Sequence, residues 1–393
     1  MKSKKTLIIY TSSDFPYGVA PENFVRQMAF GLKINDVDLV ICRIKGRYYS
    51  YQNDTGIKCT NLVYSWWPKN EFFKFLGIIF IIFVIPVSVL KNYIKYKPTA
   101  LILYGIEYFY FVLPFWILSR LLGIKVIRII TDLYSRNILS PYWWKRPKIF
   151  FYNIQFKYFD RFLNGVVCLS SYLEQIAVKY NVKKNRIEII PHFIDVEGFS
   201  KNIFSLKINQ NIKIGFCGHV SRENGIYDLI DAFIILIKHN KNIELQIIGE
   251  PSSDDQLKII NKLGDYKDMI SVTGFLDKDS VKIALDSCDI LINPRKSGVL
   301  AEAGFPTKLG EYFAMKKPIV STKTGDIKYY FENKKELILV EPDDPTSLAN
   351  GINYLIQNRD KAKQIAEEGY LWALENLDFI KNSSKLIKFL DRI

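Results

Sequence analysis

Short apolar runs rich in Ile, Val and Leu alternate with longer helical stretches along most of this chain. Such runs, bounded by turn residues, are typical of buried strands, and an intervening helix lets two of them lie parallel. Helices on both faces of a parallel sheet give a doubly wound α/β fold. The alternation occurs twice, and the two series meet near 192–211, where Pro191 and Gly198 interrupt regular structure. A chain of 393 residues with 49% apolar residues is therefore predicted to form two α/β domains.

In the first series we expect strands at 6–10, 37–44, 100–103, 126–130, 165–169 and 186–190, with helices at 22–32, 71–96, 106–122 and 171–180. In the second series we expect strands at 212–216, 243–249, 271–274, 289–293, 318–321 and 337–340, with helices at 225–240, 253–263, 279–287, 307–315 and 345–357. The tail, 360–393, is predicted to be one or two amphipathic helices.

The segment 303–322 carries the strongest signal for chemistry, because it predicts a Gly-Pro loop, a short helix and a buried strand in succession. Pro306 suits the start of a helix, since its missing N–H would have no partner there. Thr307 and Lys308 then offer N–H groups, a hydroxyl and an ammonium at the positive end of the helix dipole, which favours a phosphate or diphosphate. Glu311 lies three residues after Lys308 on the same face and can accept hydrogen bonds from sugar hydroxyls. This pattern indicates a nucleotide or nucleotide-sugar site, and an ordinary Pro-started helix is the alternative.

A second candidate for ligand contact follows the first expected strand. Gly18 lies in the polar loop after residues 6–10 and permits close backbone approach at the carboxyl end of that strand. Open parallel sheets bind their ligands at this edge, although a single glycine loop is weak evidence.

Charge is distributed unevenly along the chain. Residues 1–205 hold 28 Lys and Arg against 13 Asp and Glu, a balance of +15, whereas the remainder holds 26 against 27, a balance of −1, for a total of +14. Aromatic residues mix with Lys and Arg at 104–116 and 142–162, which suits either a membrane interface or single-stranded nucleic acid. Because no nucleic-acid-binding module is recognisable, we predict a membrane surface and no nucleic-acid partner.

The apolar run 75–90 is shorter than a spanning helix needs, so we expect a buried or surface-dipping helix there.

The cysteines and histidines give no metal or disulfide pattern. Five cysteines are scattered without a CxxC pair, which is typical of reduced thiols in a cytosol. The three histidines are far apart, so no metal site is expected. The first apolar run is only strand-length, so we expect no signal peptide and a cytoplasmic protein at the inner face of the membrane.

Several motifs occur in an order that resembles glycosyltransferase family 4. They are Pro191-His-Phe-Ile-Asp195, Phe216-Cys-Gly-His-Val-Ser-Arg-Glu-Asn-Gly225, Ile247-Ile-Gly249, Val272-Thr-Gly-Phe-Leu276, Cys288-Asp-Ile-Leu-Ile-Asn-Pro294, and Gly304 to Thr322 with Gly325. The resemblance implies a GT-B fold, in which two Rossmann-like domains face each other across a cleft. The implied domains are 1–198, which binds the acceptor and is joined by a returning helix at 375–393, and 199–374, which binds the nucleotide sugar.

The resemblance also implies the activity. It predicts a retaining, metal-independent, hexosyltransferase-like enzyme of bacterial envelope polysaccharide assembly, with no cofactor and a UDP-sugar favoured over a GDP-sugar as donor. The expected acceptor is a glycan or a polyprenyl-diphosphate-linked saccharide at the membrane. A catalytically silent GT-B protein that binds nucleotide or scaffolds a partner is one alternative, and a sugar-nucleotide epimerase is another.

Some motif positions depart from the family pattern. The first of the family's two glutamates falls on Ala303, with Glu302 one residue early, while Glu311 fills the second place. The family's Arg and Lys fall on His219 and Asn224, and Arg222 lies between them. A histidine that often precedes Asp-Leu-Tyr in the first domain is Thr131 here, which leaves Asp132 at the end of a strand.

We therefore predict Asp132, Glu302 and Lys308 as catalytic residues. The predicted donor-binding residues are Gly18, Gly218, His219, Arg222, Phe275, Pro306, Thr307, Lys308, Leu309 and Glu311.

Overall fold

The computed structural model describes residues 5–13, 20–46, 56–64, 71–131, 146–199, 211–240, 242–252, 262 and 264–393. The chain divides into two compact units, the first formed by Met1–Phe193 with Phe379–Ile393 and the second by Ile194–Asp378. Our sequence-based division put the boundaries at 198/199 and 374/375, within a few residues of these positions.

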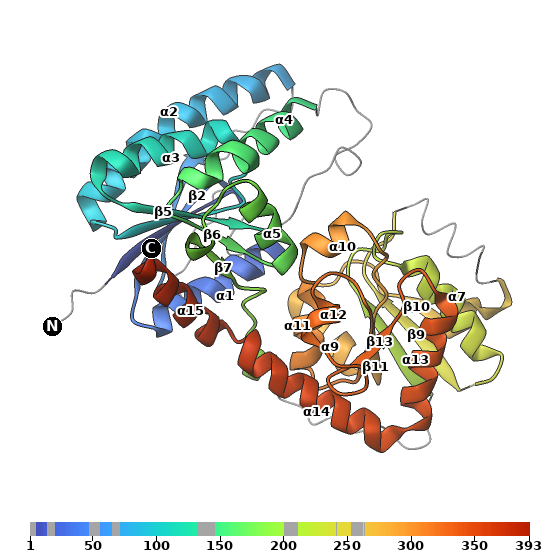
Figure 1. Ribbon diagram of the computed structural model, residues 1–393. Helices are drawn as coiled ribbons and strands as arrows, with labels where there is room; N and C mark the ends of the chain where they lie inside the picture. The colour runs from blue at the N-terminus through green and yellow to red at the C-terminus, as the bar shows by residue number, and fades with distance from the viewer. Residues whose placement is uncertain are drawn as a thin grey trace. The chain divides into compact units, whose positions relative to one another are not determined.

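The first unit contains one seven-stranded parallel sheet in the order β3-β2-β1-β4-β5-β6-β7. In Figure 1, α2, α3 and α4 cover one face of this sheet, and α1 and α15 cover the other. Its elements are β1 (Thr6–Thr11), α1 (Ala20–Ile34), β2 (Asp38–Gly46), β3 (Lys58–Tyr64), α2 (Glu71–Tyr96), β4 (Ala100–Tyr104), α3 (Phe109–Leu122), β5 (Lys125–Ile130), α4 (Arg146–Ile154), η2 (Gln155–Phe159), η3 (Asp160–Phe162), β6 (Gly165–Cys168), α5 (Ser171–Lys179), η4 (Lys184–Arg186), β7 (Ile187–Ile189) and α15 (Phe379–Arg392).

The final helix, α15, packs on α1 in the first unit, as the GT-B fold predicts for the end of the chain. A side chain at Gly31 would collide with the Phe379 carbonyl and the Ser383 hydroxyl, so this glycine allows the two helices to approach closely. Asn382 adds a buried hydrogen bond of 2.6 Å from its amide to the His192 carbonyl. The chain therefore returns to the first unit through specific contacts.

Helix α2 is longer than the apolar run on which our sequence argument rested. Among the described residues it is the one helix that is long and apolar enough to cross a bilayer by length and composition, over Ile79–Tyr96. Its length therefore does not exclude a membrane span, contrary to our expectation for the run 75–90. One side of the helix is nevertheless fixed in the domain core, because Ile81, Ile85 and Val89 are buried.

The second unit contains a six-stranded parallel sheet in the order β10-β9-β8-β11-β12-β13. One core packs α7 and α13 on the sheet, and another packs α9, α11 and α14. The elements are α6 (Val196–Phe199), β8 (Ile212–Cys217), α7 (Ile226–Ile237), β9 (Ile243–Ile248), η5 (Gly264–Met269), β10 (Ile270–Val272), α9 (Lys278–Asp286), β11 (Ile290–Asn293), α10 (Val299–Ala303), α11 (Thr307–Ala314), β12 (Ile319–Thr322), α12 (Ile327–Tyr330), β13 (Ile338–Val340), α13 (Pro345–Gln357) and α14 (Arg359–Asn376).

Side-chain caps fix the start of two helices in this unit. The Asp277 carboxylate accepts the N–H groups of Asp279 and Ser280 at the start of α9. At α13, Asp344 caps the helix in the same way, and Pro345 occupies its first turn. The helices therefore begin where the sequence places an acidic residue before the apolar stripe.

Candidate functional site

The strand order of the second unit creates a topological switch point. The chain runs from β8 outward through β9 and β10 to one edge, then returns to β11 on the other side of β8. Connections leave β8 and β11 in opposite directions, and doubly wound sheets bind ligands at the carboxyl ends of such strands. Gly218 follows β8 at this edge, and Arg295 follows β11.

Helix α11 is anchored to the end of β8 by two side chains one turn apart. The Tyr312 hydroxyl accepts the Cys217 N–H at 2.8 Å. Lys308 extends toward the same strand, and its Nζ lies 4.3 Å from the centre of the Phe216 ring. A methyl group placed on Gly218 would lie 3.5 Å from this Nζ, so the ammonium group lies beside the backbone at the switch point. The predicted residues Lys308 and Gly218 are therefore brought together.

The ammonium group of Lys308 has an unusual environment. Although the residue as a whole is partly exposed, its Nζ atom is buried and has no hydrogen-bond partner among the described residues. Burial, together with the positive charge of Arg295, lowers the pKa of Lys308 from 10.5 to about 7. A buried cation without a partner is costly, and an anion placed beside it would recover much of that cost.

The start of α11 presents backbone donors next to this lysine. Pro306 precedes the helix, and the first N–H groups, those of Thr307 and Lys308, have no partner within the helix. Leu309 differs from our prediction of a donor contact, because its N–H donates to the Pro306 carbonyl at 3.0 Å. The Leu309 side chain is also fully buried in the core, so it anchors the helix and does not face a ligand.

Glu311 lies one turn further along α11. Burial raises the pKa of its carboxyl group from 4.5 to about 7, although the positive charge of Lys278 acts in the opposite direction. The structure gives no ion pair between Glu311 and Lys308, although both residues are described. Burial disfavours the carboxylate form of Glu311, and hydrogen bonds donated by ligand hydroxyls would stabilise that form.

Glu302, on α10, is already engaged within the unit. One carboxylate oxygen accepts the Gly325 N–H at 3.2 Å, and the other accepts the Lys328 ammonium at 3.1 Å. Gly325 has φ +56°, and a side chain there would lie 2.5 Å from the Ala301 carbonyl oxygen. Glu302 therefore fixes the loop after β12 against α10, and it is half-exposed toward solvent.

Arg295 is a residue that our sequence analysis missed. Its guanidinium donates to the carbonyls of Leu300 (2.8 Å) and Gly304 (3.3 Å), so it supports the segment that leads into α11. Its position two residues after a buried strand at the switch point is the sequence signal that could have identified it. The Arg295 carbonyl in turn accepts the Thr322 hydroxyl at 2.7 Å.

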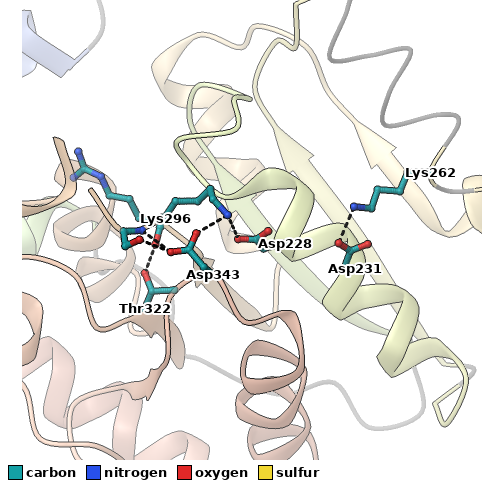
Figure 2. A network of polar contacts seen from close by, with 8 residues as sticks. Asp228, Asp231, Lys262, Lys296, Thr322 and Asp343 are labelled. Carbon is teal, nitrogen blue, oxygen red and sulfur yellow. Dashed lines mark hydrogen bonds and ion pairs between the residues drawn. The ribbon is translucent and has the colours of Figure 1, made fainter. Parts of the chain in front are cut away.

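The next residue, Lys296, holds the loop after β11 in place. Figure 2 shows its ammonium between Asp228 of α7, at 2.9 Å, and Asp343 of the loop after β13, at 2.5 Å. The Lys296 N–H also donates to the Glu223 carbonyl at 3.2 Å. The loops that follow β8, β11 and β13 are thus tied together around the base of the site.

Glycines occupy the carboxyl ends of three neighbouring strands. Gly218, Gly249 and Gly274 have φ values of +136°, +152° and +72°, which favour glycine. A side chain at Gly249 would lie 2.1 Å from the Gly218 carbonyl oxygen, so the backbones approach closely at this edge. Phe275 follows Gly274 and is 71% exposed, which leaves its ring available to a planar group.

The other predicted donor-binding residues lie in the loop after β8. His219 and Arg222 are both exposed, and the Asn224 amide donates to the His219 carbonyl at 2.8 Å. Gly225 closes this loop, because its φ is +75° and a side chain would collide with the Pro294 carbonyl. The structure therefore places Arg222 on a loop braced against Pro294 at the switch point.

Two predicted residues, Gly18 and Asp132, lie outside the described residues. Within the described part of the chain, no group of three or more His, Cys, Asp or Glu side chains could hold a metal ion.

Residues 199–372 match the family Glycosyl transferases group 1. An uncharacterized glycosyltransferase of Methanocaldococcus jannaschii is 24% identical over 235 residues, 58% of each chain. The capsular polysaccharide biosynthesis glycosyltransferase CapM of Staphylococcus aureus is 22% identical over 240 residues, 54% of this chain and 60% of CapM. The chain thus spans little more than half the length of these curated relatives.

Likeness to solved structures extends over both units. HepE of Anabaena, crystallised in complex with UDP and glucose, aligns with a TM-score of 0.72 and 14% identity over 99% of this chain and 100% of HepE. Two parallel α/β sheets, a returning C-terminal helix and this likeness show that the fold is GT-B, as predicted, and the second unit carries the group 1 glycosyl transferase pattern.

Proposed function

We propose that this protein is a retaining glycosyltransferase that moves a sugar, in hexosyltransferase-like fashion, from a nucleotide sugar to a glycan or a polyprenyl-diphosphate-linked saccharide. The observation that carries the proposal is the Lys308 ammonium, buried without a partner beside Gly218 at the switch point of the second unit. A diphosphate supplies the negative charge that this site lacks. The match to group 1 glycosyl transferases supports the same activity.

The leaving group defines the main task of the site. As the anomeric bond breaks, negative charge builds on the diphosphate, and fixed donors in a water-poor site stabilise it best. Lys308, the N–H groups of Thr307 and Lys308, and the positive charge of Arg295 and Arg222 fill this role. Because these cations can replace a divalent ion at the diphosphate, we propose a metal-independent reaction without a cofactor.

The nucleoside and sugar take the remaining contacts. Glu311 accepts the ribose hydroxyls, and the exposed Phe275 ring stacks on the base. Glu302 retains lone pairs beyond its bonds to Gly325 and Lys328 and contacts the donor sugar. We favour a UDP-sugar, in keeping with the UDP complex of HepE.

We attribute retention of the anomeric configuration to attack by the acceptor hydroxyl on the face that the leaving group occupies. A phosphate oxygen of the donor takes the proton of that hydroxyl. The acceptor binds in the first unit, and Asp132 remains its predicted catalytic residue. The basic first unit and the capsule relative CapM support an acceptor of the cell envelope, with the protein at the cytoplasmic membrane face.

The test begins with thermal shifts against UDP, GDP, ADP and their sugars, followed by assays of nucleotide release. We expect UDP and a UDP-sugar to stabilise the protein, and Glu311→Ala to abolish turnover while circular dichroism shows an intact fold. Nucleotide binding without turnover with any lipid-linked acceptor would indicate a silent protein. Conversion of the donor sugar to an epimer would indicate an isomerase. Turnover measured in EDTA tests metal independence, and we expect it to be undiminished.

A further inference from the structure

Helix α2 carries two apolar stripes on opposite sides, and the core covers only one of them. Ile81, Ile85 and Val89 are buried, and Asn92 on the same side donates to the Tyr10 hydroxyl at 3.0 Å. The second stripe, among the residues of α2 whose side chains are described, consists of the exposed Phe80, Phe83, Val87, Leu90 and Ile94, with Ile79 exposed beside it.

The exposed stripe is regular. Its members are spaced three and four residues apart, so they share one face of the helix, and they span about 21 Å at 1.5 Å per residue. Phe83 is 71% exposed and Ile94 is 76% exposed. Helix α3 packs beside α2 (Figure 1). It carries two exposed apolar residues of its own, Ile117 and Leu121. An apolar surface of this extent marks an interaction site.

The charges around the exposed stripe indicate what kind of surface binds to it. Lys91, Lys95 and Lys97 are exposed at the C-terminal end of α2, where the ring of Tyr96 lies 5.0 Å from the Lys95 ammonium. Glu71 is the one acidic residue within α2, and α3 has none. Anionic lipid headgroups complement the lysines, and acyl chains complement the stripe.

We propose that the exposed stripe of α2 docks the protein on an anionic bilayer, with α2 lying along the surface. The buried stripe and the Asn92–Tyr10 hydrogen bond hold the helix in the domain, so docking requires no unfolding of the core. This inference specifies how the protein reaches the membrane and rests on the membrane location in the proposed function, although its test does not require turnover.

Flotation with vesicles of phosphatidylcholine mixed with phosphatidylglycerol, at low salt, tests the proposal. Wild type floats with these vesicles and floats less with phosphatidylcholine alone or at high salt. Phe83→Ser and Ile94→Ser each reduce the partition coefficient by about tenfold or more, because each removes one inserted apolar side chain. Lys91→Gln and Lys95→Gln each reduce it by about fivefold at low salt.

The matched control is Ile283→Ser on α9, since Ile283 is 72% exposed, nearly as much as Ile94. It retains wild-type flotation. Equal losses for Ile94→Ser and Ile283→Ser, absence of wild-type flotation, or a dimer in sedimentation that Phe83→Ser dissociates would each overturn the proposal. A wild type that binds UDP without floating refutes only the docking, whereas one that floats without binding any nucleotide refutes only the proposed function.

Discussion

Replacing Lys308 by Met separates the stability of the site from its function. Met has a similar length and no charge, so it fills the space beside Phe216 and Gly218 while removing the buried ammonium. We expect this substitution to stabilise the nucleotide-free protein and to impair nucleotide binding. A residue that only supported the fold would give the opposite result for stability.

The magnitude follows from the pKa of Lys308. A decrease from 10.5 to about 7 corresponds to at most about 5 kcal/mol of unfavourable free energy in the folded state. Met forfeits the contact of the ammonium with the Phe216 ring, so we expect a net gain of about 1–3 kcal/mol. In a unit of this size, each 1 kcal/mol raises the melting temperature by about 2–4 °C.

The sign of the pH dependence is fixed by the direction of the shift. Because the folded pKa is lowered, the penalty is complete below about pH 7 and is lost as the pH rises toward the unfolded value of 10.5. The stability advantage of Lys308→Met should therefore shrink between pH 7 and pH 10. With UDP at about a hundred times its dissociation constant, wild type should gain about 2.7 kcal/mol, and the variant should gain little at the same concentration.

Thermal denaturation across this pH range, with and without UDP, measures both effects. Lys317→Met is the matched control, because the Lys317 ammonium is also largely buried but donates to the Asp286 carbonyl at 2.7 Å. This control should lose about 1 kcal/mol of stability and keep its response to UDP. A less stable Lys308→Met protein at pH 7, or one that UDP stabilises as strongly as wild type, would refute the reasoning.

Three further substitutions test the site. Glu311→Gln should weaken nucleotide binding by about tenfold at pH 8. Wild-type binding should weaken below pH 7, because the Glu311 carboxyl group, with its pKa of about 7, becomes protonated there. Titration calorimetry should show no such weakening in the variant. Gly218→Ala should lower the free energy of unfolding by about 1–3 kcal/mol through backbone strain at φ +136°, and it should also reduce UDP affinity. The control is Gly123→Ala, at φ +68° with nothing within 4 Å of the added methyl group. Melting and binding assays of both variants should show a loss of stability alone for Gly123→Ala. Tyr312→Phe leaves the Cys217 N–H without its acceptor, so urea unfolding should show a loss of about 1–3 kcal/mol, and an unchanged midpoint would argue against this anchor.

Much of the fold could be predicted from local sequence, because buried parallel strands are continuous apolar runs and helix starts have capping residues. β3 was missed because Lys58–Tyr64 mixes Lys, Thr and Asn with apolar residues and so lacks a continuous apolar run. It is an edge strand that pairs only with β2, and an edge strand tolerates polar residues. The short helices α6, α10 and α12 were also missed, since four or five residues carry no helical periodicity. The predicted helix 253–263 lies almost wholly outside the described residues.

The site was harder to predict than the fold. Pro306 and Lys308 identified the start of α11, but the burial of the Lys308 ammonium depends on Gly218, about ninety residues earlier in the chain. The same holds for Tyr312, whose hydroxyl meets the Cys217 N–H only in the folded unit. Arg295 had no recognisable motif, although its position after a buried strand is informative once the strand order is known.

The two units share a strand order but differ in the chemistry of their switch points. In the first unit, hydroxyl groups lie at the carboxyl end of β1, where the Thr11 and Ser13 hydroxyl oxygens are 2.8 Å apart. The Ser12 hydroxyl donates to the carbonyl of Gly105, which follows β4, at 2.7 Å. In the second unit, the corresponding edge holds Lys308 and Arg295. Cations favour a diphosphate, whereas neutral hydroxyls exchange hydrogen bonds with sugar hydroxyls without a charge requirement. This difference supports our proposal that the donor binds in the second unit and the acceptor in the first, a division that the shared fold alone does not imply.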